Sequence, residues 1–182
     1  MSNIWFISDT HFCHNQEFIY SVRGFQSVED MNRAIVERWN KLVHQDDIVY
    51  HLGDIILNDI DTGIDLVKQL KGHIRLAIGN HDTEGKLSRY KMLGLFDDIQ
   101  FGYRFKYHNK KFLLSHYPQL TGNFDESKTY SIHGHTHAAT AFCEYDMMYN
   151  VCCEAHNCYP ISLDEIIIDI DTYKQEKLQG QI

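Results

Sequence analysis

The sequence predicts a single α/β domain with a parallel sheet in its first half and a second sheet after it. The chain of 182 residues is 43% hydrophobic, which is enough to bury one sizeable core. Apolar runs typical of strands cover residues 4–8, 47–51 and 74–78, and helix-like segments separate them. This alternation implies right-handed parallel crossovers, which bring the carboxyl ends of the strands to one edge of the sheet.

Helices are expected over residues 28–43, with Ser27 as the N-cap, and over residues 62–70, because apolar residues recur there at helical spacing. In the second half, residues 103–107 and 111–115 flank His108-Asn109-Lys110 and predict a hairpin. Further strands are expected at residues 130–133, 140–145, 148–151 and 166–170, which together predict a mostly antiparallel second sheet.

The C-terminal region carries a capping-box pattern at residues 162–165, which predicts a short turn of helix. The residues after it, 173–182, are polar and are expected to form a tail. The predicted domain therefore covers residues 1–172.

Composition limits the classes of partner. The formal charge of −8 and the pI near 5.8 argue against a broad basic groove for long nucleic acid, although a strand end held by metals stays open. No run approaches the roughly 20 apolar residues that span a bilayer, and the N-terminus shows no signal pattern. The five cysteines lack C-x-x-C spacing and are expected to be reduced. We therefore expect a cytoplasmic protein without a membrane partner.

Five short polar motifs recur in order along the chain, each next to a β-like run. They are Asp9-Thr10-His11, Gly53-Asp54, Gly79-Asn80-His81-Asp82, Ser115-His116-Tyr117 and Gly134-His135-Thr136-His137. One motif of this kind arises by chance, but five in order indicate a site that can hold two metal ions. Residues two apart on an extended segment project to one side, so Asp9 and His11 are expected to face one site together, as are His135 and His137.

The residue types suit a binuclear centre. Asp54, on a tight turn after a buried strand, is the candidate for the carboxylate that bridges two ions. Asn80 is a neutral ligand, so two divalent ions, two aspartates and a bridging hydroxide leave the site electropositive and favour an anion. Imidazole and carboxylate ligands without thiolate indicate manganese, iron, zinc or nickel rather than calcium, and manganese is the expected activator in vitro.

His81 follows Asn80 directly and should lie at the edge of the site, where an imidazole can act as a general acid. The alternative is a histidine that only packs or hydrogen-bonds beside the ligands. His14, Asn15 and Arg23 lie on the loop after the first motif and are candidates for contacts with a substrate phosphate, with a solvated loop as the equal alternative.

The five motifs together resemble those of the calcineurin-like metallophosphoesterases, whose pattern is D-x-H, G-D, G-N-H-[DE], a lone H and G-H-x-H. The segments DTHFCHNQEFI, DDIVYHLGD and PISLDEI further resemble a group of small phosphoesterases from bacteria and phages, and the similarity spans nearly the whole chain. Cys13 stands where that group often has glycine. The resemblance implies a four-layer αββα sandwich of two mixed sheets flanked by helices.

The resemblance also implies a distribution of the ligands. One metal would be held by Asp9, His11, Asp54 and His137, and the other by Asp54, Asn80, His116 and His135. His81 would be the catalytic histidine.

The expected function is a two-metal phosphoesterase in which a metal-activated hydroxide attacks phosphorus, the metals and Asn80 stabilise the transition state, and His81 protonates the leaving oxygen. Phosphodiesters of the nucleotide type are favoured, because no insertion in the chain resembles a lid. The alternatives are a phosphomonoesterase, a nuclease acting on strand ends, and a metal-binding scaffold of the same fold without activity.

Overall fold

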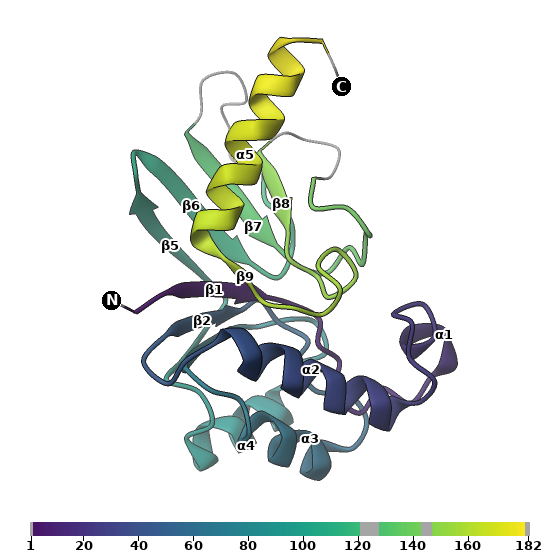
Figure 1. Cartoon of the computed structure of the whole chain (residues 1–182). Helices are drawn as coiled ribbons and strands as arrows, with labels where there is room; N and C mark the ends of the chain where they lie inside the picture. Colours follow the sequence, from purple (N-terminus) through teal and green to yellow (C-terminus); the bar gives the residue numbers. More distant parts are fainter. Residues whose placement is uncertain (1, 121–127, 143–146, 181–182) are drawn as a thin grey trace.

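The computed structural model describes residues 2–120, 128–142 and 147–180, which form two β-sheets and five helices (Figure 1). The first sheet has the strand order β4-β3-β2-β1-β9. Its strands are β1 (Ile4–Ile7), β2 (Ile48–His51), β3 (His73–Ala77), β4 (Asp98–Gln100) and β9 (Ile161–Ser162). Strands β1 to β4 are mutually parallel, as predicted, and only β9 runs antiparallel to its neighbour β1.

Three helices cover one face of this sheet. They are α2 (Val28–Leu42), α3 (Ile60–Val67) and α4 (Glu84–Leu93), and the short helix α1 (Glu17–Tyr20) precedes them. The Ser27 side chain caps α2 by accepting a hydrogen bond from the Asp30 amide, as expected from the sequence. Helix α3 begins and ends slightly before the predicted segment, and α4 was not predicted. Buried side chains such as Ile35 and Trp39 of α2 pack with Val49 and Leu76 of the sheet.

The second sheet has the order β5-β6-β7-β8, with β5 (Gly102–Tyr107), β6 (Lys110–Ser115), β7 (Thr129–His133) and β8 (Met148–Asn150). The predicted hairpin β5–β6 is present, and its turn residues His108 and Asn109 both have positive φ, which matches the twist of the flanking strands. The prediction of a mostly antiparallel sheet is wrong, because β6, β7 and β8 run parallel to one another. Strand periodicity is the same in both orientations, so the sequence pattern did not distinguish them.

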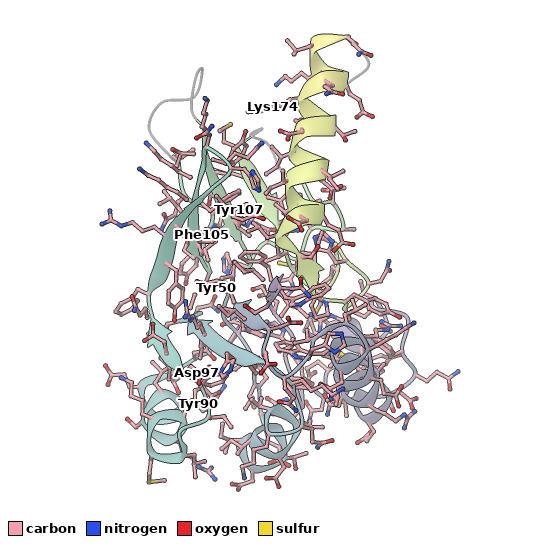
Figure 2. All side chains as sticks on the ribbon, turned by 60° about the vertical axis from the view of Figure 1, so that its left-hand side comes forward. Tyr50, Tyr90, Asp97, Phe105, Tyr107 and Lys174 are labelled. Atoms are coloured by element: carbon pink, nitrogen blue, oxygen red, sulfur yellow. The ribbon has the colours of Figure 1, made fainter. Side chains whose placement is uncertain are left out.

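An apolar layer fills the space where the two sheets meet. Phe6 and Tyr50 of the first sheet stack with Phe105 of β5, and Figure 2 labels Tyr50 and Phe105 in this layer. Helix α5 (Leu163–Leu178) adds Leu163, Ile166 and Ile170 to the same cluster. The molecule is thus an α/β structure of two mixed sheets flanked by helices, as the resemblance implied.

Helix α5 corrects a second expectation. The segment 166–170 is helical and not a strand, and the helix continues through residues 173–178 of the predicted tail. The capping box is present: the Ser162 hydroxyl accepts from the Glu165 amide and the Glu165 carboxylate accepts from the Ser162 amide. It starts a long helix rather than a short turn, and the apolar run fits either structure by composition alone. Half of the predicted strand 140–145, residues 143–145, lies outside the described residues.

The topology gathers the five motifs. Three of them follow β1, β2 and β3 of the first sheet, and two follow β6 and β7 of the second, at the ends where parallel strands finish. No helix in the described part of the chain is long and apolar enough to cross a membrane.

Candidate metal centre

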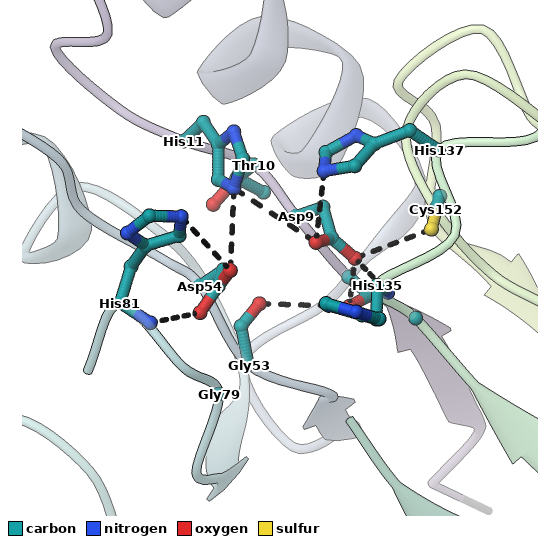
Figure 3. Close-up of polar contacts among 12 residues, drawn as sticks. Asp9, Thr10, His11, Gly53, Asp54, Gly79, His81, His135, His137 and Cys152 are labelled. Carbon is teal, nitrogen blue, oxygen red and sulfur yellow. Dashed lines mark hydrogen bonds and ion pairs between the residues drawn. The ribbon is translucent and has the colours of Figure 1, made fainter. Parts of the chain in front are cut away.

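The first half of the site is built around Asp9 and two histidines (Figure 3). Asp9 Oδ1 lies 3.5 Å from His137 Nε2 and 3.8 Å from His11 Nε2. All three side chains offer a ligand atom toward one point, and Asp9 and His11 are buried. A carboxylate and two imidazoles in this arrangement are suitable ligands for a divalent transition metal.

Asp54 joins this half to a second one. Its Oδ2 atom lies 3.5 Å from His11 Nε2 and also 3.5 Å from His116 Nε2, while Oδ1 accepts a hydrogen bond of 2.7 Å from the His81 amide. Oδ2 is therefore shared by both halves of the site, whereas Oδ1 accepts a hydrogen bond from the backbone. Burial opposes ionisation of this carboxyl group, but the neighbouring imidazoles of His11 and His116 hold the pKa of Asp54 at about 2.

The second half is formed by residues of both sheets. His116 Nε2 lies 2.8 Å from Asn80 Oδ1 and 3.2 Å from His135 Nδ1. The other nitrogen of His116, Nδ1, donates to the carbonyl oxygen of Leu52 at 2.9 Å, which leaves the Nε2 lone pair available for a ligand. Side-chain atoms of Asn80, His116 and His135 thus converge on one point.

The buried polar atoms of the site test whether a metal would fit. Asp9 Oδ2 accepts from Ser8 Oγ at 2.5 Å, from the His135 amide at 2.9 Å and from Cys152 Sγ at 3.2 Å. In contrast, Asp9 Oδ1 and His11 Nε2 are buried and have no hydrogen-bond partner within the described residues. Buried polar atoms without partners are rare and costly, so this donor set fits divalent cations.

The backbone at the site is strained. Asp9, His11, Asp54, His135 and His137 all have positive φ, between 49° and 68°. The expectation that Asp9 and His11 converge through an extended segment is therefore wrong, and so is the same expectation for His135 and His137. Left-handed geometry at a non-glycine residue costs about 1–3 kcal/mol and persists only where surrounding contacts impose it.

Glycines of the motifs allow the loops to approach each other. A Cβ atom on Gly134 would lie 1.9 Å from Ser8 Oγ and 2.5 Å from Asp9 Oδ2. A Cβ atom on Gly79 would lie 2.2 Å from Asp54 Oδ1. Both glycines are thus needed because a carboxylate of the site occupies the space of a side chain.

His81 lies at the rim of the centre. Its Nε2 atom is 3.9 Å from Asp54 Oδ2, and 48% of its side chain is exposed to solvent. The carbonyl oxygen of His81 accepts from Lys86 Nζ at 2.9 Å, and the same ammonium donates to Ile56 O. The side chain is therefore within reach of a group bound at the site, and its backbone is held from behind.

The three candidates for phosphate contacts have different surroundings. His14 is buried, its ring centroid lies 5.5 Å from that of His11 with the two rings tilted, and burial lowers its pKa to about 4. Asn15 is exposed and accepts from Asn58 Nδ2 at 2.8 Å. Arg23 is buried and directs its guanidinium into the protein, toward Glu154 and the backbone of the first motif. This geometry gives no support to a direct contact between Arg23 and substrate.

Among the side chains that touch the candidate ligands, sequence reasoning missed Glu154 and Cys152 as well as Ser8. Glu154 Oε1 lies 3.1 Å from His137 Nδ1, and Cys152 Sγ donates to Asp9. Burial opposes ionisation of Glu154, but His137 and Arg23 hold its pKa at about 2. Neither Glu154 nor Cys152 lies in a recognisable motif. The only signal is their position directly after β8, which is parallel to β7 and ends at the same edge.

Comparisons with known proteins identify the family of this chain. A model of the calcineurin-like phosphoesterase superfamily domain matches residues 2–151. The uncharacterized protein MJ1445 of Methanocaldococcus jannaschii is 37% identical over 177 residues, which cover 92% of this chain and 90% of that protein. The gene 66 protein of Mycobacterium phage L5 is 28% identical and covers 76% of this chain and 79% of its own.

A solved structure shares the fold of this chain. The protein of unknown function AQ665 from Aquifex aeolicus superimposes with a TM-score of 0.70 and 28% identity, over 91% of this chain and 98% of that one. The family match covers most of the chain and includes all five motifs. This chain belongs to the calcineurin-like phosphoesterase superfamily.

Proposed function

We propose that this protein is a hydrolase of phosphoesters that works with two divalent metal ions. The observation that carries the proposal is the sharing of Asp54 Oδ2 between two donor sets, at 3.5 Å from His11 Nε2 and 3.5 Å from His116 Nε2. One ion would be held by Asp9, His11, Asp54 and His137. The other would be held by Asp54, Asn80, His116 and His135.

When bound, divalent ions supply Lewis acidity toward phosphoryl oxygens and acidify a water molecule. The protein's own groups would do the rest. His81, exposed at the rim and near Asp54, is placed to give a proton to the leaving oxygen as its bond to phosphorus breaks. Asn80 directs Oδ1 toward His116, and its amide nitrogen can donate a hydrogen bond to a phosphoryl oxygen.

Phosphodiesters of the nucleotide type are the favoured substrates. The ring of Tyr117 is half-exposed and lies 4.6 Å from the ring of His135, so it offers an aromatic face beside the proposed ligands. A planar base next to the scissile phosphate could stack there. Phosphomonoesters are the alternative substrates. A metal-binding scaffold without activity is a further alternative.

The test compares bis(p-nitrophenyl) phosphate with p-nitrophenyl phosphate, using metal-stripped protein reloaded with manganese. We expect faster cleavage of the diester and loss of activity in Asp54→Asn, which removes the charge without changing the shape. Asp65→Asn is the matched control, because Asp65 is an exposed carboxylate on α3 whose ion pair with Lys68 lies at the surface.

Each outcome decides between the alternatives. Activity confined to the monoester would favour a phosphatase. Protein that binds manganese but cleaves neither compound, nor a panel of nucleotide esters, would favour the scaffold. Near-normal activity of Asp54→Asn would contradict the assignment of Asp54 as the bridging ligand.

A further inference from the structure

Arg23 is enclosed by groups of the first motif and by Glu154. Its side chain is 1% exposed, and its Nε and Nη2 atoms donate to Glu154 Oε1 at 2.8 and 2.7 Å. Nη1 donates to Thr10 O at 3.0 Å, and Nη2 also donates to Asp9 O at 2.7 Å. One guanidinium therefore connects the backbone of the first motif to a carboxylate that is distant in the sequence.

The carboxylate of Glu154 connects this arginine to the last motif. Its Oε1 atom accepts from His137 Nδ1 at 3.1 Å as well as from Arg23, and its side chain is only 9% exposed. Because an ionised carboxylate can only accept, His137 must carry its proton on Nδ1. In the neutral imidazole the other nitrogen, Nε2, then carries no hydrogen, and it faces Asp9 Oδ1 at 3.5 Å.

The first motif needs such a contact because its backbone is strained. Asp9 and His11 have φ values of 55° and 49°, which a non-glycine residue rarely adopts. The two hydrogen bonds from Arg23 to Asp9 O and Thr10 O hold the carbonyl groups within this strained turn. The same arginine thus restrains the loop that carries Asp9 and His11, and orients the acceptor of His137.

We propose that Arg23 and Glu154 are positioning residues for one metal position, the one formed by Asp9, His11 and His137. The inference rests on the proposed function, since it takes these three residues as ligands. The pair acts through geometry, because its two charges balance and both side chains are buried, with 1% of Arg23 and 9% of Glu154 exposed. In the described part of the chain, neither Arg23 nor Glu154 hydrogen-bonds to the side chains of the second metal position, which are Asn80, His116 and His135. Loss of the pair should therefore leave the second position unchanged.

The first test measures manganese binding by equilibrium dialysis of metal-stripped protein, without any assay of activity. Glu154→Gln keeps the size of the side chain but removes the charge and one acceptor oxygen. We expect affinity at one of two positions to fall by about 10- to 100-fold, while the other changes little. The exposed ion pair of Arg33 with Asp30 on α2 provides the control variant, Arg33→Gln, which should bind both ions normally.

The second test asks whether Glu154 acts through His137. Manganese affinity is compared in Glu154→Gln, His137→Ala and the double variant. If Glu154 only orients His137, the double variant should bind no more weakly than His137→Ala, so the two losses are not additive. Additive losses, or equal weakening at both positions together with a lower unfolding temperature, would show a general structural role and overturn the inference.

A third readout does not depend on metal. In the metal-free protein, the proton on His137 Nδ1 should give an imidazole NH signal in nitrogen-15 NMR that is lost in His137→Ala and shifted in Glu154→Gln. An unshifted signal in Glu154→Gln would contradict the assignment of Glu154 as its acceptor.

Metal binding by the variants also distinguishes an error in the proposed function from an error in the positioning role. If His137→Ala left binding at both positions unchanged, His137 would not be a ligand and the proposed metal site itself would be wrong. If His137→Ala weakened one position but Glu154→Gln and Arg23→Lys did not, the site would stand and the positioning role would be wrong. Arg23→Lys keeps the charge but cannot reach all three acceptors, so it should show the same selective loss as Glu154→Gln.

Discussion

Asp54 Oδ2 and His116 Nε2 lie 3.5 Å apart, although Asp54 follows β2 of the first sheet and His116 follows β6 of the second. The proposed metal centre is therefore at the junction of the two sheets. A metal bound there would connect the sheets as well as serve the chemistry, because its ligands come from both. Four predictions follow from the arrangement of this centre and of the residues at its rim.

Manganese should stabilise the folded protein. Binding to the native state alone adds about 2.7 kcal/mol when free metal is roughly a hundredfold above its dissociation constant. For a chain of this size, that corresponds to an increase in unfolding temperature of about 5–10 °C. Thermal unfolding followed by circular dichroism, with manganese and with chelator, measures the difference. Asp54→Asn should lose most of it, and an unchanged transition in the wild-type protein would contradict metal binding at this junction.

Gly134→Ala should damage the site severely. The new Cβ atom would lie 1.9 Å from Ser8 Oγ and 2.5 Å from Asp9 Oδ2, so the first and last motifs would have to move apart. Overpacking of this kind costs about 1–3 kcal/mol of stability, and displacement of Asp9 should abolish activity. Gly85→Ala is the control, because a Cβ atom there meets no atom within 4 Å and alanine favours helix α4. Normal activity of Gly134→Ala would show that the motifs do not need this close contact.

His81→Ala should be sensitive to the leaving group. A general acid contributes about 100- to 10,000-fold when an alkoxide leaves, but much less when the leaving group is p-nitrophenolate, which needs no proton. The measurement compares kcat for a diester with an alkyl leaving group and for bis(p-nitrophenyl) phosphate. Equal losses on both substrates would instead indicate that His81 only packs beside the ligands.

Tyr117→Leu should weaken binding of nucleotide diesters. Loss of a stacked base costs about 1–3 kcal/mol, so KM should rise by about tenfold while kcat changes little. Tyr117→Phe keeps the ring and should behave like the wild-type protein. A dialkyl phosphodiester, which has no planar group, should be cleaved equally by all three proteins. If Tyr117→Leu left KM for nucleotide diesters unchanged, the ring would not contact the base.

Local patterns predicted those elements whose residues act on one another within a few positions. The Ser27 cap marked the start of α2, and the alternation of strands with helices gave the parallel order of β1 to β3. The same patterns failed where one stretch of residues is compatible with two different secondary structures or strand orientations. The apolar run in residues 166–170 fits a strand or a helix, and the orientation of β7 beside β6 depends on residues distant in the sequence.

The candidate ligands could be identified from the sequence because their residue types, order and motif glycines are local properties of the chain. The chemistry of imidazole and carboxylate groups then indicated divalent metals. The backbone conformation at the site, in contrast, depends on contacts with distant parts of the chain. These contacts impose the left-handed backbone found at four of the candidate ligands, Asp9, His11, His135 and His137. The expectation of an extended segment therefore named residues that the structure brings close together, such as Asp9 and His11, but with the wrong backbone geometry.

The sequence by itself determined which side chains can bind metal and that they follow strand ends, since both depend on residue type and local periodicity. Only the tertiary structure decided how those side chains are supported. Arg23 and Glu154 are 131 residues apart, and no local pattern relates them. Their contact exists because the loop after α1 and the end of β8 pack against the first motif, and a buried guanidinium must find acceptors wherever the fold places them.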